Sequence, residues 1–116
     1  MRQNDLSERL FRFSVRTIKY LRKIPFNDET KVLKNQLIKS SSSTCANYEE
    51  SQAGSSKADF ANKVRISLRE MRETIFWLRL MKELDYQKYD VEEFQWLENE
   101  SKELSKILGS ICQKSK

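Results

Sequence analysis

The sequence predicts an all-α fold, an up-down-up-down left-handed four-helix bundle in which residues 1–116 form one domain. The chain of 116 residues has only two Gly and one Pro, too few for an all-β fold, which needs a turn about every 8–12 residues. Its composition, 38% hydrophobic and 34% charged, is typical of amphipathic helices that each show water a wide polar face. Apolar residues recur at steps of three and four in four segments, so we expect helices at about 5–24, 28–53, 57–84 and 91–113.

The first expected helix carries an apolar series from Leu6 to Ile24 on one face. It should end before Pro25, because the residue that precedes a proline avoids helical dihedral angles. Asn27 then suits the N-cap of the second helix, since its side-chain oxygen can accept a hydrogen bond from a backbone N–H of the first turn. The first two helices are therefore expected to be joined by a short connection.

The second expected helix contains a run of four serines at 40–43. Serine is a poor helix former at interior positions, so this run could instead be a flexible linker. The helical period continues across it from Leu37 to Tyr48, however, and we therefore predict a helix. Its short side chains would let a neighbouring helix approach closely. Gly54 is expected to end this helix in a left-handed cap.

The third and fourth expected helices each begin with a capping pattern. Ser56 is followed three residues later by Asp59, and Asp90 is followed at the same distance by Glu93. Each helix then continues in an apolar series with steps of three and four residues. Because all the connections are short, consecutive helices should run antiparallel.

The net charge of +5 is unevenly distributed. Residues 1–39 hold ten Lys and Arg against four Asp and Glu, whereas residues 40–116 hold twelve against thirteen. This asymmetry indicates an acidic partner or a polyanion, although solubility alone could also account for it. No apolar run approaches the roughly 18 residues of a membrane span, and the N-terminus lacks a hydrophobic signal core. We therefore expect a cytoplasmic protein without membrane contact, with Cys45 and Cys112 as buried thiols and a disulfide as the alternative.

The residue types that most catalytic and metal sites need are scarce. The chain has no His, the commonest general base and the commonest transition-metal ligand. Its two cysteines are too few for a zinc site, which takes three or four protein ligands. It also has no Gly-rich phosphate loop. We therefore predict a protein that is not an enzyme, with no catalytic residues, no metal and no cofactor.

Five cations recur at steps of three and four along one face of the first helix, with no acid between them: Arg9, Arg12, Arg16, Lys19 and Lys23. A structural face would normally mix signs to avoid like-charge repulsion, so we interpret this series as a surface that binds RNA or DNA through phosphate contacts. A solvated face, or pairing with acids of the third or fourth helix, is the alternative. A second series on the third helix has Glu70 and Glu73 beside it: Arg65, Arg69, Arg72 and Arg79.

Aromatic side chains could add base stacking to such a surface. Phe11, Tyr20 and Tyr48 are candidates, although aromatic residues at helical spacing are more often part of the core. The first and third helices also carry more apolar residues than one bundle seam requires, and surplus apolar surface on a soluble chain usually marks an interface. We therefore predict a homo-oligomer whose interface contains these residues: Phe11, Val15, Ile18, Ile66, Trp77, Leu80 and Leu84.

The segment 27–85 resembles a family of small bacterial four-helix-bundle proteins, the 23S rRNA-intervening-sequence or S23-like proteins. The matching residues include Leu37-Ile38-Lys39-Ser40, Ser43, Ala46-Asn47, Glu50, Ser56-Lys57-Ala58-Asp59-Phe60, Ile66, Leu68, Glu73, Thr74, Trp77 and Leu78. The resemblance implies an up-down bundle that assembles into a ring, typically a homopentamer. It also implies that Asn47, Glu50 and Glu73 form a structural polar set between the second and third helices.

A related group, the accessory proteins of diversity-generating retroelements, is similar in fold and forms basic pentameric barrels that bind nucleic acid and a reverse transcriptase. From the residues and the resemblance together we expect a non-enzymatic, ring-forming bundle that binds RNA or DNA electrostatically through its first helix. The alternative is a protein–protein adaptor or scaffold that does not bind nucleic acid.

Overall fold

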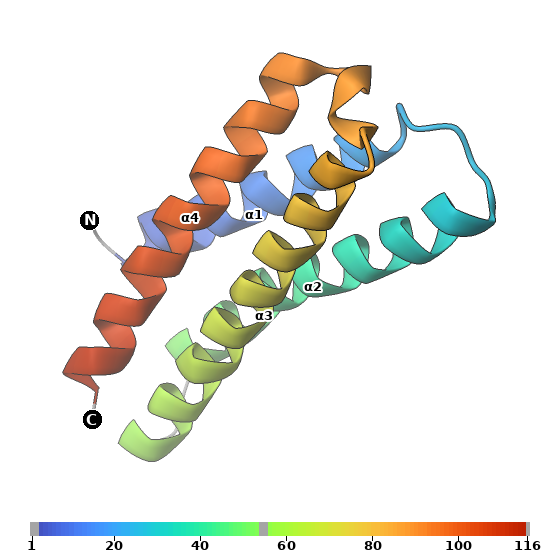
Figure 1. Cartoon of the computed structure of the whole chain (residues 1–116). Coiled ribbons are helices and arrows are strands. Elements are labelled where there is room, and N and C mark those ends of the chain that lie inside the picture. Colours follow the sequence, from blue (N-terminus) through green and yellow to red (C-terminus); the bar gives the residue numbers. More distant parts are fainter. Residues whose placement is uncertain (1–2, 54–55, 116) are drawn as a thin grey trace.

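The computed structural model describes residues 3–53 and 56–115, without the side chains of residues 3 and 4. It confirms an all-α four-helix bundle, and the described residues contain no strand (Figure 1). The helices are α1 (Gln3–Leu21), α2 (Asp28–Gln52), α3 (Lys57–Glu83) and α4 (Val91–Lys114). A short 3-10 helix, η1 (Tyr86–Tyr89), lies between α3 and α4.

The first helix ends three residues earlier than the sequence predicts. After Leu21 the chain tightens into turns, in which the N–H of Lys23 donates to the carbonyl oxygen of Tyr20 and the N–H of Ile24 to that of Leu21. Ile24 is nevertheless buried, because the turn folds its side chain back against the core. The steric restriction that Pro25 imposes on the residue before it is consistent with a helix that ends short of Ile24.

The Ser-rich run is helical, so the linker alternative is wrong. Asn27 caps α2 as predicted, since its side chain accepts from the N–H of Thr30 while the Thr30 hydroxyl accepts from the N–H of Asn27. Within the run, the Ser42 hydroxyl donates to the carbonyl oxygen of Ile38, which satisfies a polar group at a solvent-exposed position. The predicted left-handed cap at Gly54 lies outside the described residues.

The remaining caps also agree with the sequence. The Ser56 side chain accepts from the N–H of Asp59 at 3.0 Å, and the Asp90 side chain accepts from the N–H of Glu93 at 3.1 Å. The connection between α3 and α4 is short, as expected, and it contains a 3-10 helix. Asp85 adopts a left-handed conformation with φ of 67°, and the chain then forms η1 before it enters α4.

The core lies along the axis of a bundle that measures 44 × 25 × 20 Å. Each helix contacts the next one along the chain, and α1 contacts α4, which closes the bundle. Among the described residues the diagonal pairs, α1 with α3 and α2 with α4, have no Cα atoms within 8 Å of one another. The largest fully buried side chains come from all four helices: Leu10, Phe13, Tyr20, Leu37, Tyr48, Met71, Leu78, Phe94, Leu97 and Leu104.

The α2–α3 pair shares the most extensive contact, and its seam is built from small polar residues. The Thr74 hydroxyl donates to the Ser40 hydroxyl at 2.8 Å, and the Ser67 hydroxyl donates to the carbonyl oxygen of Thr44 at 2.6 Å. All four of these side chains are fully buried. Short side chains therefore let the two helices approach closely, as the Ser-rich run predicted.

Candidate nucleic-acid interface

Two of the five predicted cations of α1 are bound to acids of α4. Arg9 donates from Nε and Nη2 to the carboxylate oxygens of Glu100 at 2.8 and 2.9 Å. Arg16 makes the same kind of pair with Glu93 at 2.9 and 2.6 Å, and its guanidinium lies 3.4 Å from the centre of the Trp96 ring. These are bidentate, partly buried pairs, which are geometrically specific and stronger than hydrogen bonds between neutral groups.

The pairing also shifts the pKa values of Arg9, Arg16 and Glu93. The hydrogen bond from Arg16, together with its charge, holds the pKa of the Glu93 carboxyl below its ordinary value. The hydrogen bond to Glu93 raises the pKa of Arg16, and the bond to Glu100 raises that of Arg9. The Arg16–Glu93 pair therefore remains ionised near neutral pH, and both pairs join the outer edges of α1 and α4.

The other three predicted cations differ in how free they are. Lys23, which lies just beyond the end of α1, pairs with Asp90, and the hydrogen bond from Lys23 lowers the pKa of that carboxyl. Arg12 lies 3.8 Å from Glu8, and both side chains are about two-thirds exposed. Lys19 is exposed and makes no ion pair with any described residue. Arg12 and Lys19 are thus the members of the series that remain available to a polyanion.

The α1–α4 pairing left a signal in the sequence. Arg9 and Arg16 are seven residues apart, as are Glu93 and Glu100, and an antiparallel arrangement brings each Arg to one Glu. Seven residues are close to two helical turns, so each pair of residues lies on one face of its helix. The alternative of pairing with acids of the fourth helix therefore applies to Arg9 and Arg16, and the matched spacings indicate which acids they meet.

The predicted polar set does not form one cluster. The Asn47 side-chain amide donates within α2, to the carbonyl oxygen and the hydroxyl of Ser43 at 2.9 and 3.0 Å. Glu50 bridges α2 and α3 through Lys63 at 2.9 Å. Glu73 is exposed and makes no hydrogen bond or ion pair with the described residues. Of the three predicted residues, only Glu50 therefore links α2 to α3. Asn47 bonds within α2, and Glu73 is exposed to solvent.

A largely apolar groove of about 360 Å³ runs between α1 and α2. Its lining contains the three predicted interface residues of α1, Phe11, Val15 and Ile18. The other lining residues are Ser14, Ser42, Cys45, Ala46 and Glu49. Phe11 is 54% exposed, so most of its ring is in contact with solvent in the single chain. The hydroxyl oxygen of Ser14 is buried and has no hydrogen-bond partner among the described residues. This face could accept apolar side chains of another molecule.

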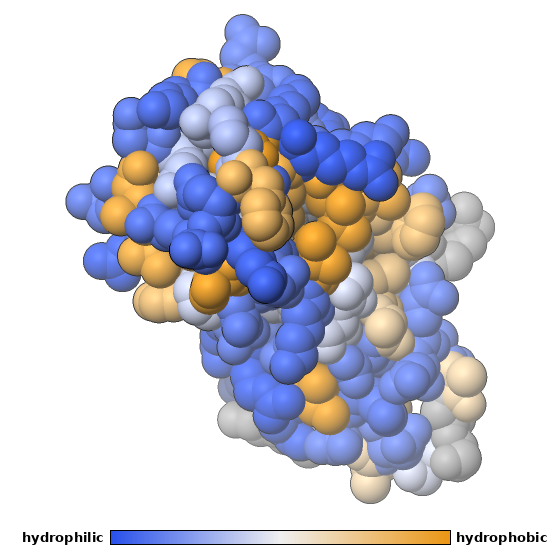
Figure 2. All heavy atoms as spheres, turned by 90° about the vertical axis from the view of Figure 1, so that its right-hand side faces the viewer, coloured by the Kyte–Doolittle hydropathy of each residue, from blue (hydrophilic) through white to orange (hydrophobic). Residues whose placement is uncertain are grey.

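The predicted interface residues of α3 form a second apolar face. Trp77 and Leu80 are half-buried and pack against the core, so part of each side chain stays open. Ile66 is also half-buried, and Leu84 is 44% exposed. Figure 2 shows one side of the molecule, on which apolar side chains reach the surface in separate groups between hydrophilic ones.

Two of the aromatic residues considered for base stacking belong to the core. Tyr20 and Tyr48 are 1% and 0% exposed, whereas Phe11 remains at the surface.

Both cysteines are free thiols; Cys45 is buried, as expected, but Cys112 is only half-buried. Within the described part of the chain, no group of three or more His, Cys, Asp or Glu is placed to hold a metal ion. No described helix has a stretch that is both apolar and long enough to traverse a lipid bilayer.

Comparisons with known proteins agree on one family. The family model described as 23S rRNA-intervening sequence protein matches residues 2–110. A crystal structure at 1.70 Å resolution of a protein of unknown function from the S23 ribosomal protein family of Bacteroides thetaiotaomicron VPI-5482 is 32% identical. The alignment covers 97% of this chain and 99% of that one, with a TM-score of 0.84. No curated protein matches significantly.

Proposed function

Since this chain belongs to the 23S rRNA-intervening sequence protein family, we propose that it is a non-enzymatic cytoplasmic bundle that assembles head-to-tail into a closed ring and binds RNA or DNA electrostatically. The observation that carries the assembly is the pair of apolar faces that the single chain leaves uncovered. One is the α1–α2 groove with Phe11, and the other is the α3 face with Trp77 and Leu84.

The two faces differ in their residues and lie on different helices, so the contact between copies would join unlike surfaces. A contact of that kind is heterologous, and it generates a ring when its rotation closes. Burial of apolar surface is the dominant favourable term in most protein association. The resemblance described above favours five copies in the ring.

A mixing experiment distinguishes this arrangement from a symmetric dimer. The Phe11→Glu variant blocks the groove, and the Leu80→Glu/Leu84→Glu variant blocks the α3 face. Each is expected to be monomeric by analytical ultracentrifugation, while an equimolar mixture forms a one-to-one heterodimer, because each variant keeps the face that the other has lost. The matched control Val91→Glu replaces a residue that is 62% exposed on neither face, and it should leave the ring intact.

The arrangement is refuted in two ways. A wild-type chain that sediments as a monomer at micromolar concentration removes the ring. A variant that remains dimeric by itself points to a symmetric contact of the intact face. Circular dichroism of each variant confirms that the helices are retained, which matters most for Leu80 because it also packs against the core.

The nucleic-acid part of the proposal rests on the positive charge of the first third of the chain and on the two exposed cations of α1 that make no contact with α4. Arg12 and Lys19 would contact phosphates, and ring assembly would repeat them on every copy. Arg9, Arg16 and Lys23 would add to the potential, although their ion pairs cancel most of their charge. Because phosphate contacts release counterions, the affinity for labelled RNA should fall steeply between about 50 and 200 mM salt.

The competing function is that of an adaptor whose ring binds another protein and no nucleic acid. The exposed apolar surface supports this alternative if it exceeds what the ring buries. Binding of RNA that does not change with salt, or no binding at all, would favour the adaptor.

A further inference from the structure

The outer face of α3 carries a row of arginines that the bundle does not use. Arg65, Arg72 and Arg79 follow one another at seven-residue intervals, so they lie along one line of the helix about 10 Å apart. Arg69 lies beside this line, and all four side chains are exposed. We call these four residues the arginine row.

Three of the four arginines make no ion pair with the described residues, in contrast to Arg9, Arg16 and Lys23 of the first series. Arg65, Arg72 and Arg79 make no hydrogen bond or ion pair with the described residues, and the closest carboxylate of Arg69 is that of its neighbour Glu70, at 3.9 Å. The first acid on this line is Glu83, four residues after Arg79, and the two make no ion pair. Three unpaired guanidiniums on one line therefore keep their full charge in water.

An aromatic ring interrupts the row. Phe76 lies four residues after Arg72 and three before Arg79, and it is 52% exposed. It contacts Trp77 edge-on, with ring centres 5.0 Å apart and planes at 73°, which fixes the orientation of the ring. An exposed, oriented aromatic side chain between two free guanidiniums is the arrangement that a stacked base with flanking phosphates requires.

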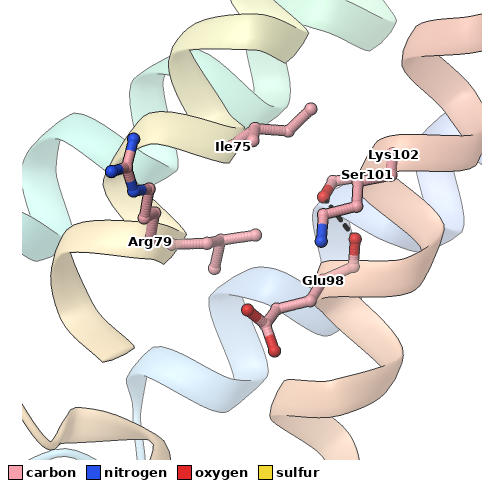
Figure 3. A pocket seen from close by; sticks show the side chains of 6 residues that line it. Ile75, Arg79, Glu98, Ser101 and Lys102 are labelled. Carbon is pink, nitrogen blue, oxygen red and sulfur yellow. Dashed lines mark hydrogen bonds between the residues drawn. The ribbon is translucent and has the colours of Figure 1, made fainter. Parts of the chain in front are cut away.

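The space next to the row does not suit a small molecule. The cavity between α3 and α4, lined by Ile75, Arg79 and Ser101 among others, has a volume of about 100 Å³, below the ~300 Å³ of an ordinary ligand pocket. Figure 3 shows Ile75 pointing towards α4, whereas the guanidinium of Arg79 points away from it. The row therefore faces solvent, where an extended chain could lie along it.

We propose that the arginine row and Phe76 form a binding surface for single-stranded nucleic acid, in which the guanidiniums contact phosphates and a base stacks on Phe76. This inference rests on the proposed electrostatic binding of RNA or DNA and adds a surface to it, on α3, besides Arg12 and Lys19 of α1. An arginine guanidinium binds phosphate more specifically than a lysine ammonium does, because its planar fork of N–H donors matches the phosphate oxygens. A single strand fits better than a duplex because its unpaired bases are free to stack.

The test compares two matched pairs of substitutions in the full-length chain. The probe is a fluorescein-labelled oligouridine of about 20 nucleotides, titrated by anisotropy from about 50 to 200 mM salt. Arg72→Gln/Arg79→Gln is expected to weaken binding at least about tenfold. The slope of log K against log salt concentration should become less negative by roughly 1.4, which is about 0.7 for each of the two lost phosphate contacts. Arg12→Gln/Lys19→Gln is the matched pair on α1, and it should weaken binding less.

The stacking part has its own variant. Phe76→Leu keeps an apolar side chain of similar size, and it should weaken oligouridine binding by about fivefold or more while leaving binding of a duplex of equal length unchanged. Since all the substituted residues are exposed in the single chain, circular dichroism of each variant should match that of the wild type. Phe76 contacts Trp77 of the proposed α3 interface, so sedimentation checks that Phe76→Leu assembles as the wild type does.

The outcomes separate this inference from the function on which it rests. Wild-type protein that binds no oligonucleotide at any salt concentration overturns both. Wild-type binding that Arg72→Gln/Arg79→Gln leaves within twofold overturns the arginine row and keeps the general proposal, with α1 as the contact. An equal effect of Phe76→Leu on single strand and duplex overturns the stacked base.

Discussion

Helices α2 and α3 each contribute a fully buried serine, Ser41 and Ser67, for which we expect opposite effects of the same substitution. Ser67 donates its hydroxyl proton to the carbonyl oxygen of Thr44 at 2.6 Å. Ser41 is just as buried, but its hydroxyl oxygen has no hydrogen-bond partner among the described residues. Replacing each with alanine therefore removes a bond in one case and an unsatisfied group in the other.

The magnitudes follow from the partners. In both variants alanine is the better helix former, by up to about 0.5 kcal/mol. Ser67→Ala loses one hydrogen bond, of about 1 kcal/mol, so its free energy of unfolding should fall by roughly 0.5 kcal/mol. Ser41→Ala loses a buried hydroxyl whose desolvation costs about 1–3 kcal/mol, so its free energy of unfolding should rise by at least about 1 kcal/mol. The two variants should therefore differ by about 1.5 kcal/mol or more.

Urea unfolding followed by circular dichroism measures this difference. With slopes of about 1–3 kcal/mol per molar urea for small proteins, 1.5 kcal/mol separates the two midpoints by roughly 0.5–1.5 M. All samples must be compared at one protein concentration, because assembly adds a concentration-dependent term to stability. If Ser41→Ala unfolds at less urea than Ser67→Ala, the hydrogen bonding of the two hydroxyls does not determine their contributions to stability.

Two further predictions concern titratable groups. The pKa of Glu93 is below its ordinary value of 4.5 in the folded chain, so its pair with Arg16 stabilises fully above about pH 4.5 and less as the pH falls through the folded-state pKa. Arg16→Gln should therefore lose less stability than wild type between about pH 6 and pH 3, measured by thermal unfolding, and an equal loss would contradict the pairing. Burial raises the pKa of the Cys45 thiol to about 11, so a maleimide at about pH 7.5 should label Cys112 first, as peptide mass spectrometry can check. Faster labelling of Cys45 would show that its side of the bundle opens.

The fold was predictable from the sequence because the helical signals are local and consistent. The period across residues 40–43 outweighed the poor helix propensity of serine, and the caps at Asn27, Ser56 and Asp90 were each visible in the residue types. The differences occur where conformation depends on more than local pattern. One is the turn that precedes Pro25, and another is the left-handed residue Asp85 that introduces η1.

The candidate site was less predictable, since a charge on a helix says nothing of what lies opposite. Arg9 and Arg12 have equivalent positions in the pattern, yet one is bound by Glu100 and the other reaches solvent. Which of the two arginines is paired depends on the rotation of α4 about its axis. The apolar period of α4 and the matching seven-residue spacings together constrain that rotation. Arg72 and Arg79, which looked less isolated beside Glu73, make no ion pair with the described residues.

The contacts between helices are spread unevenly around the bundle, and this determines where the folded chain should open locally. The α1–α4 contact is the smallest of the four between neighbouring helices, and both ion pairs and aromatic contacts cross it, whereas the contact within the α2–α3 hairpin is the largest. Local opening takes place where fewest contacts must break, so the first and last helices should separate while the hairpin stays closed. Amide protons of α2 and α3 should then exchange with deuterium last, and added salt should quicken exchange chiefly along α1 and α4.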